Sequence, residues 1–180
     1  MDAITMIKER RSVIKYKAEK VDRETMREIV DIARWAPSWV NYQIARYTLV
    51  DDEEIIKEIA EHGVNGFVYN IDTLRTAKGV AVLSFVKGKS GTYDKEYITS
   101  KGNSWEVFDA GIACQTFCLA AHAKGVGTCI MGVIDDKSIA KIVNLPEDET
   151  VAALIVYGYE DGEHAAPNKR KDVDEIMRFV

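Results

Sequence analysis

The chain has 180 residues, of which 47% are apolar and 29% charged, so it is long enough to bury a core and has about the size of one domain. Its formal charge of −5 is modest and its basic residues are spread along the chain, which argues against a nucleic-acid partner. The amino terminus has no apolar signal region and no run approaches the roughly 20 apolar residues of a membrane span, so we expect no membrane partner.

Helical and extended patterns alternate along the chain. Met26 and Ile29 recur at helical spacing after Asp22, a residue type that favours helix N-caps, and Pro37 would end that helix. The run "GVAVLSFV" at 79–86 is apolar almost throughout, as in a strand buried on both faces. Helices are therefore expected over 3–11, 22–36, 52–63, 104–124 and 136–143, strands over 46–50, 79–86 and 151–159, and a short apolar segment at 129–134.

This alternation places the chain in the α/β (α+β) class. Helices and strands mixed in one chain of this size pack with helices on both faces of a central sheet. We find neither an internal repeat nor a low-complexity linker, so residues 1–180 are expected to form a single domain.

One segment does not fit this pattern. Residues 87–104, "KGKSGTYDKEYITSKGNS", are polar and contain three glycines and two tyrosines. They connect a core strand to a core helix over a length that is unusual in compact domains. Two interpretations stay open: a lid over a ligand, and a mobile surface insertion without a role.

A group of cationic and hydroxyl side chains lies in "KERRSVIKY", residues 8–16. Arginines near the carboxyl end of a helix are favoured by the helix dipole alone, which would explain Arg10 and Arg11. Two guanidinium groups beside the Ser12 hydroxyl also suit a phosphate, since arginine donates in bidentate fashion and serine adds a neutral donor. This segment alone does not separate the two interpretations.

The stretch "ARWAPSWVNYQ" at 33–43 is richer than a turn requires. A turn explains Pro37 and the serine after it, but it does not explain Trp39 crowded with Asn41 and Gln43. Amides both donate and accept, which suits the edge of a heterocycle with carbonyls and ring nitrogens, and an aromatic side chain can cover its face. We therefore expect a flat heterocyclic ligand near this stretch.

Glycines mark a third stretch, "AKGVGTCIMGVID" at 123–135. Glycine allows the backbone to come close to a flat ligand. The stretch lacks both the dinucleotide fingerprint and a P-loop lysine, so it is a poor match to a phosphate loop. A turn at the end of a helix would explain Gly125, whereas Gly132 has no such explanation.

The three cysteines, Cys114, Cys118 and Cys129, form an odd set without a CxxC pair. This pattern argues against a disulfide framework and indicates a reducing compartment, so we expect a cytoplasmic location. Cys114 and Cys118 lie one helical turn apart, but no histidine or carboxylate is spaced to complete a metal site. Helix packing is the simpler interpretation for these two and for His122, and we expect no metal.

Five stretches in this order and spacing resemble the FMN-dependent nitroreductase family. No single motif is specific, but five in register are, and the likeness covers nearly the whole chain, most weakly over 87–104. The stretches are "RRSVIKY", "APSWVNYQ", "NIDTLRTAKGVAVL" (70–83), "DAGIACQTFCLAAHAKGVGTCIMG" (109–132) and "PNKRKDVDEIM" (167–177). The resemblance implies a nitroreductase-like, three-layer sandwich with a mixed, largely antiparallel sheet. It also implies an intertwined homodimer with one FMN at each of two interfaces, contacted by both chains.

The resemblance implies an oxidoreductase in which NADH or NADPH gives a hydride, through flavin N5, to a small electron acceptor. Nitroaromatics, quinones or similar electron-poor compounds would react by a ping-pong mechanism. Because the cofactor carries the chemistry, we name no catalytic acid or base. The alternative is a flavin-binding storage or sensing protein with only adventitious turnover. The physiological acceptor, the choice of nucleotide, and a specialised dehalogenating or desaturating activity stay open.

Residues of the family motifs carry over to matching positions of this sequence. The phosphate and ribityl chain would be held by Arg10, Arg11, Ser12 and Arg170; the partner chain would place Pro37, Ser38, Trp39 and Asn41 against the isoalloxazine; Asn70 would meet the pyrimidine edge; and the backbone of Met131 and Gly132 would lie near N5.

Three positions depart from the family pattern. Ile14 and Thr73 stand where members of the family carry cations near flavin N1 and O2, and Val133 replaces a common glycine. A positive charge at that edge stabilises the anionic reduced flavin by Coulomb attraction. We therefore expect these departures to affect the flavin potential and the range of acceptors.

Overall fold

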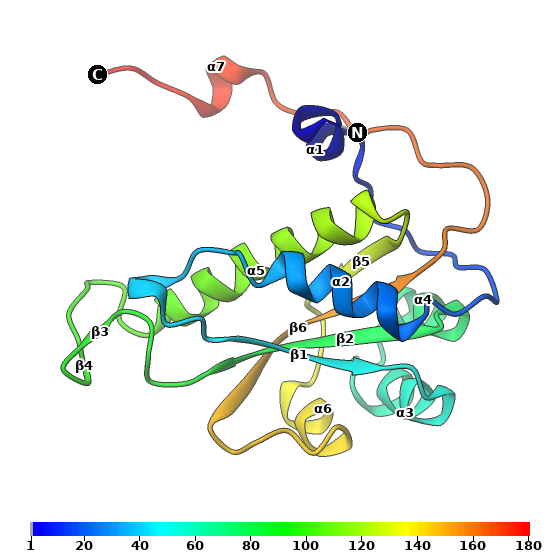
Figure 1. Ribbon diagram of the computed structural model, residues 1–180, viewed down its shortest axis with the longest axis horizontal. Helices are drawn as coiled ribbons and strands as arrows, with labels where there is room; N and C mark the ends of the chain where they lie inside the picture. The colour runs from blue at the N-terminus through cyan, green and yellow to red at the C-terminus, as the bar shows by residue number, and fades with distance from the viewer. Residues whose placement is uncertain (1) are drawn as a thin grey trace.

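The computed structural model describes residues 2–180 (Figure 1). Its helices are α1 (Ala3–Glu9), α2 (Arg23–Ala33), the short 3-10 turn η1 (Trp39–Asn41), α3 (Glu53–His62), α4 (Val68–Thr76), α5 (Ser104–Ala123), α6 (Asp136–Ile142) and α7 (Val173–Ile176). Its strands are β1 (Ala45–Val50), β2 (Gly79–Val86), β3 (Thr92–Tyr93), β4 (Glu96–Tyr97), β5 (Gly127–Met131) and β6 (Glu149–Gly158).

Aspartate side chains cap the amino ends of several helices. The Asp22 carboxylate accepts a hydrogen bond from the Thr25 N–H at 2.8 Å, and Asp52 accepts from the N–H two residues on at 2.9 Å. Asp2 and Asp135 do the same for α1 and α6. A cap of this kind contributes about 1 kcal/mol to helix stability. The cap predicted at Asp22 is confirmed.

The main sheet has the strand order β1-β2-β6-β5, and each pair of neighbours is antiparallel. β2 lies between β1 and β6 and is buried over seven of its eight residues, as its unbroken apolar run predicts. Ser12 forms a parallel bridge with Thr128 of β5, and the Val13 N–H donates to the Thr128 carbonyl at 2.9 Å. The strand pairing is therefore mixed and largely antiparallel, as expected.

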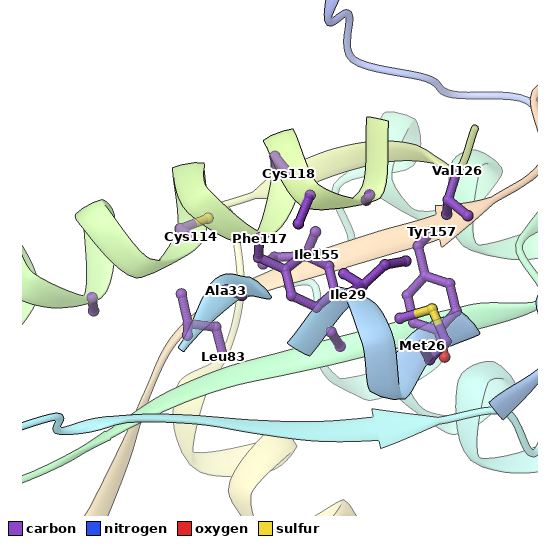
Figure 2. Close-up of a cluster of buried hydrophobic side chains, with 14 of the residues drawn as sticks. Met26, Ile29, Ala33, Leu83, Cys114, Phe117, Cys118, Val126, Ile155 and Tyr157 are labelled. Atoms are coloured by element: carbon purple, nitrogen blue, oxygen red, sulfur yellow. The ribbon is translucent and has the colours of Figure 1, made fainter. Parts of the chain in front are cut away.

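Helices α2 and α5 cover one face of this sheet (Figure 1). Figure 2 shows Ile29 of α2 and Phe117 of α5 packed toward Ile155 of β6. Full burial of each such side chain contributes about 1.5–3 kcal/mol. Cys114 and Cys118 are buried in the same cluster, which agrees with the packing interpretation of these two cysteines.

Helices α3, α4 and α6 cover the other face. Ile59 of α3, Leu74 of α4 and Ile139 of α6 are fully or almost fully buried in a second cluster with β2 and β6. The two clusters lie on opposite sides of the sheet because side chains alternate between its faces. The predicted three-layer sandwich is confirmed.

Several predicted boundaries differ from the structure. α2 ends at Ala33 instead of residue 36, because the N–H groups of Trp35 and Ala36 bond three residues back in a tighter turn. The residue before a proline disfavours the helical region, so the chain leaves the helix ahead of Pro37. The short apolar segment noted at 129–134 overlaps β5, which begins and ends earlier. α1 ends two residues before the expected position 11.

Helix α4 was not predicted. It overlaps the first part of the quoted stretch 70–83, but only Asn70, Thr73 and Leu74 of its nine residues are buried. Two of these three are polar, so the apolar periodicity that would reveal a helix is weak.

Both ends of the chain extend along or beyond the body. No residue of α1 is buried, and residues 161–180 are exposed throughout, forming an arm that leads away from the sheet (Figure 1). Val173, Ile176 and Phe179 are apolar residues on this arm. None of the helices described here combines the length and the apolar character that crossing a membrane would require.

Candidate functional site

Helix α1 brings Arg10 and Arg11 to the edge of the sheet. The helix ends one residue before Arg10, whose backbone N–H caps it. Two residues later Ser12 pairs with Thr128 of β5. The two arginines therefore stand where the helix meets the sheet, and Ser12 follows them along β5.

Gly127 permits this close pairing. A Cβ at Gly127 would lie 2.7 Å from a methyl carbon of Val13, a distance that real side chains do not adopt. Val13 is buried, whereas its neighbours Ser12 and Ile14 are exposed. The alternation presents Ser12 on the outer side of the segment.

The two arginines have different surroundings. Arg11 donates from Nε to the Ala165 carbonyl at 3.1 Å and from Nη1 to the carbonyls of Lys8 at 2.6 Å and Arg10 at 3.0 Å. These bonds tie the end of α1 to the carboxyl-terminal arm. The half-buried Arg10 guanidinium forms no hydrogen bond or salt bridge with any residue in the range 2–180, so its donors remain available to an external anion.

A pocket of about 250 Å³ lies beside these arginines. Its wall includes His122, Glu160 and His164 as well as the backbone turn that precedes β5. The His122 and His164 rings stack with their centroids 6.2 Å apart. Cationic donors therefore outnumber the single carboxylate in this pocket, which suits an anionic group.

The contacts of His164 favour its protonated form. Its Nδ1 lies 2.7 Å from a Glu160 carboxylate oxygen, and its Nε2 lies 2.8 Å from the Glu9 carbonyl oxygen. Both partners only accept, so both ring nitrogens must donate. The hydrogen bond to Glu160 is the main cause that raises the pKa of His164 above its ordinary value, and the hydrogen bond to Glu9 is the second. Burial is the main cause that lowers the pKa of His122.

The far end of β5 presents backbone donors beside an amide side chain. Asn70 of α4 donates from Nδ2 to the Val133 carbonyl at 3.1 Å, which fixes this asparagine against the turn after Met131. Within residues 2–180, the N–H groups of Gly132, Val133 and Ile134 have no protein acceptor. A Cβ at Gly132 would meet no atom within 4 Å, so a flat group can approach the backbone there.

The departures from the family pattern leave this end of β5 without a cation from either position. The Thr73 hydroxyl donates to the Tyr69 carbonyl one turn back at 2.9 Å, and Thr73 is buried. Ile14 is exposed and apolar. Neither residue supplies a positive charge beside Asn70.

The segment after α2 has an unusual backbone. Val40, Asn41 and Gln43 have φ values of 46°, 56° and 50°, in the left-handed region that L residues other than glycine rarely adopt. Each such residue costs on the order of 1–3 kcal/mol, and this kind of strain clusters at ligand sites. The Ser38 hydroxyl accepts from the Gln43 N–H at 2.8 Å and closes the turn.

Trp39 anchors this segment to its neighbours. Its backbone N–H donates to Asp109 Oδ2 at 2.9 Å, and its indole N–H donates to the Thr92 carbonyl at 3.0 Å. The ring packs against Trp105, with 5.1 Å between the centroids. These contacts give Trp39 a structural role that the sequence did not reveal.

Residues 87–104 form a hairpin, β3–β4, whose base is buried. Ser90 and Thr92 are almost inaccessible, whereas Tyr93 is 72% exposed. The Tyr97 hydroxyl donates to Glu106 at 3.1 Å. The tip is therefore presented to solvent from a fixed base.

The expected binding residues fall into separate regions of one chain. Arg10–Ser12 lie beside the start of β5, near the carboxyl end of α5, whereas Trp39 contacts Trp105 and Asp109 at the amino end of α5. The 17 residues between Trp105 and His122 correspond to about 25 Å of helix. Figure 1 shows α1 and the β3–β4 hairpin at opposite ends of α5.

Arg170 also stands apart. It lies on the exposed arm, and its guanidinium donates to the Asn168 carbonyl at 2.9 Å. Within residues 2–180 no contact brings it to Arg10.

Glu106 and Asp109 are site residues that sequence reasoning missed. They are charged side chains one turn apart on an otherwise apolar helix, and they are only 4% and 3% exposed. That spacing was visible in the sequence and could have marked them as buried hydrogen-bond acceptors.

Several solved and curated proteins are similar to this chain. An FMN-dependent nitroreductase from Clostridium difficile R20291 shares 28% identity, covers 98% of each chain and superimposes with a TM-score of 0.78. A 4-nitrobenzoate reductase from Nocardioides sp. (strain LMS-CY) is 24% identical over 99% of this chain and 89% of its own length. An iodotyrosine deiodinase from Thermotoga neapolitana is 24% identical over 87% of each protein.

The two helical layers around an antiparallel sheet agree with the fold of these solved structures. The model of the Nitroreductase family matches residues 7–159, which include every element from β1 to β6. The chain therefore belongs to the nitroreductase family.

Proposed function

We propose that this protein is an FMN-dependent oxidoreductase that uses NADH or NADPH to reduce nitroaromatics, quinones or similar electron-poor acceptors by a ping-pong mechanism. The observation that carries the proposal is the open backbone at 132–134, whose three N–H donors lie beside Asn70 and have no acceptor within residues 2–180. The names of the relatives support it, since one is an FMN-dependent nitroreductase and two others act on substituted aromatic compounds.

The residues along β5 fit the parts of FMN. Arg10 offers the phosphate a guanidinium that has no hydrogen-bond or salt-bridge partner within residues 2–180, and the exposed Ser12 offers a hydroxyl for the ribityl chain. Ser12 faces Thr128, and Gly132 lies four residues further, or about 13 Å along the strand. That spacing suits a ligand with a phosphate at one end and a ring system at the other. We therefore assign the whole range 1–180 to one FMN-binding domain.

The backbone N–H groups at 132–134 would orient the ring, and Asn70 would bind its pyrimidine edge. When bound, FMN supplies the redox chemistry by taking a hydride from NAD(P)H and passing it to the acceptor. The protein's contribution is to place donor and acceptor in turn over the same ring.

A second copy of the chain would complete the site. Arg10 and Trp39 lie too far apart in one chain to touch one flavin. A partner chain can bring its own 37–41 segment to the flavin-binding residues along β5. α5 is apolar on its outward side as well, with Phe108 and Val107 more than half exposed. Exposed large apolar side chains that lie next to each other often mark an interface, so this part of α5 fits a homodimer interface.

The position of residues 87–104 supports the lid interpretation. Its hairpin is bonded to the 37–41 segment, and Tyr93 projects from it with most of its ring accessible. An exposed tyrosine can stack on a flat acceptor. We propose that this hairpin selects acceptors.

The test is an absorption spectrum of the purified protein, followed by anaerobic titration with NADH and with NADPH. Bound FMN should be reduced within seconds by at least one nucleotide, and steady-state double-reciprocal plots should be parallel, with turnover of about 1 to 10³ per second. Flavin that binds but is reduced only over minutes would favour the storage or sensing alternative. Failure of FMN to bind would overturn both.

A further inference from the structure

The two buried acids of α5 connect parts of the chain that are far apart in sequence. Neither Glu106 nor Asp109 forms a salt bridge within residues 2–180. In that range their hydrogen-bond donors are backbone N–H groups and hydroxyl groups, all uncharged. Burying a carboxylate costs free energy unless hydrogen bonds satisfy it. The arrangement is therefore maintained by its hydrogen bonds, and these lead to two segments outside α5.

Asp109 closes a ring of contacts. Its Oδ2 accepts from the Trp39 N–H at 2.9 Å and from the Ser90 hydroxyl at 2.5 Å. The Trp39 indole then donates to the carbonyl of Thr92, two residues beyond Ser90, at 3.0 Å. The 37–41 segment and the lid hairpin are thus fixed to the same carboxylate and also to each other.

Glu106 extends the same connection along the hairpin. Its Oε1 accepts from the Gly88 N–H at 2.5 Å, from the Lys89 N–H at 3.3 Å and from the Tyr97 hydroxyl at 3.1 Å. Both the entry and the second strand of the lid therefore bond to α5. Displacing the hairpin as a body would leave buried acceptors without donors, which is costly.

We infer that Asp109 is a positioning residue that holds the 37–41 segment and the lid hairpin in one fixed arrangement. The inference rests on the proposed function, because that function gives the 37–41 segment its contact with the flavin and the lid its contact with the acceptor. Asp109 is only 3% exposed and its Oδ2 accepts from Trp39 and Ser90, so we assign its effect to these two contacts.

One consequence is that cofactor affinity and acceptor selection depend on the same side chain. A lid displaced from Asp109 takes the Thr92 carbonyl away from the Trp39 indole, which loosens the 37–41 segment and its strained backbone at Val40. Groups that share a hydrogen-bond network show coupled energies for this reason.

The experiment compares two replacements of Asp109. Asp109→Asn keeps an oxygen that can accept both bonds, whereas Asp109→Ala removes the acceptor. We expect Asp109→Ala to weaken FMN binding by about 10-fold and to change the relative KM values of a small and a large acceptor, with Asp109→Asn within about 3-fold of wild type for both.

Ser84→Ala is the matched control. Ser84 is also fully buried and donates to a carboxylate, that of Glu149, at 2.5 Å, but it lies on β2 and contacts neither segment. Hydrogen exchange of the apoprotein supplies a readout that needs no flavin. In Asp109→Ala the Trp39 amide and the Gly88 amide should both exchange about 10-fold faster, and in Ser84→Ala neither should change.

Equal loss of FMN affinity in Asp109→Asn and Asp109→Ala would mean that charge and not geometry matters, and would overturn the inference. A folded Asp109→Ala with normal exchange at both amides would also overturn it. If that variant does not fold, Ser90→Ala and Trp39→Phe each remove one bond of the ring, and each should speed exchange in both segments. A change confined to the mutated segment would refute the coupling. If wild type binds no FMN, the proposed function fails while the exchange data still test the connection.

Discussion

Replacing Arg10 by alanine should separate binding of the FMN phosphate from folding. The Arg10 guanidinium has no hydrogen-bond or salt-bridge partner within residues 2–180, so its removal breaks no such bond of the described chain. If it grips a phosphate, its loss removes a charge-assisted contact of about 1.5–3 kcal/mol, and FMN should bind ~10- to 150-fold more weakly. Arg170→Ala should give a loss of the same order if the arm reaches the phosphate.

Arg11→Ala is the matched comparison. The Arg11 guanidinium donates hydrogen bonds to three carbonyl oxygens. Each bond is worth roughly 0.5–1.5 kcal/mol and is partly exposed, so the loss of Arg11 should lower the free energy of unfolding by about 1–2 kcal/mol. We expect a smaller effect on FMN affinity than that of Arg10→Ala.

The assay is a fluorescence titration of apoprotein with FMN and with riboflavin, which lacks the phosphate. Arg10→Ala should weaken FMN binding and leave riboflavin nearly unchanged. If both ligands lose affinity equally, Arg10 supports the fold and not a phosphate, and the reasoning from its free guanidinium is wrong.

Three further results are expected. Val107→Glu should place a charge on the outward face of α5, and sedimentation velocity should then show monomers in place of a dimer, with FMN lost in parallel. The control Lys57→Glu, on α3, should leave the dimer intact. A dimeric Val107→Glu would exclude α5 from the interface. The pKa of His164 is raised, so the stability that this residue contributes is complete below the unfolded pKa of about 6.5 and is lost as pH rises through the higher folded value. Limited proteolysis should therefore cut the arm faster at pH 8 than at pH 6. Glu160→Gln should abolish that difference. Thr73→Lys should add a cation beside Asn70 and raise the flavin potential by about 30 mV or more, the equivalent of ~1.4 kcal/mol for two electrons; an unchanged potential would show that this edge of the site does not sense the added charge.

The elements whose signals are local could be predicted from the sequence. Asp22 and Asp52 cap helices through bonds that span two or three residues, and the apolar run of β2 marks a central strand without reference to any other segment. The candidate site residues could also be named from the sequence, because the motifs that contain them occur there in a fixed order. Helix α4 escaped prediction because its buried side includes Asn70 and Thr73, which carry no apolar signal.

Only the tertiary structure decided how those residues are used. Arg10 and Arg11 are adjacent in sequence and line the same pocket, but they differ because Arg11 also donates to the carbonyl of Ala165, 154 residues away. Trp39 is an anchor because Thr92 and Asp109 lie beside it in space. Such contacts join segments that are distant in the chain, and their geometry is set by how whole helices pack on the sheet, which local patterns do not encode.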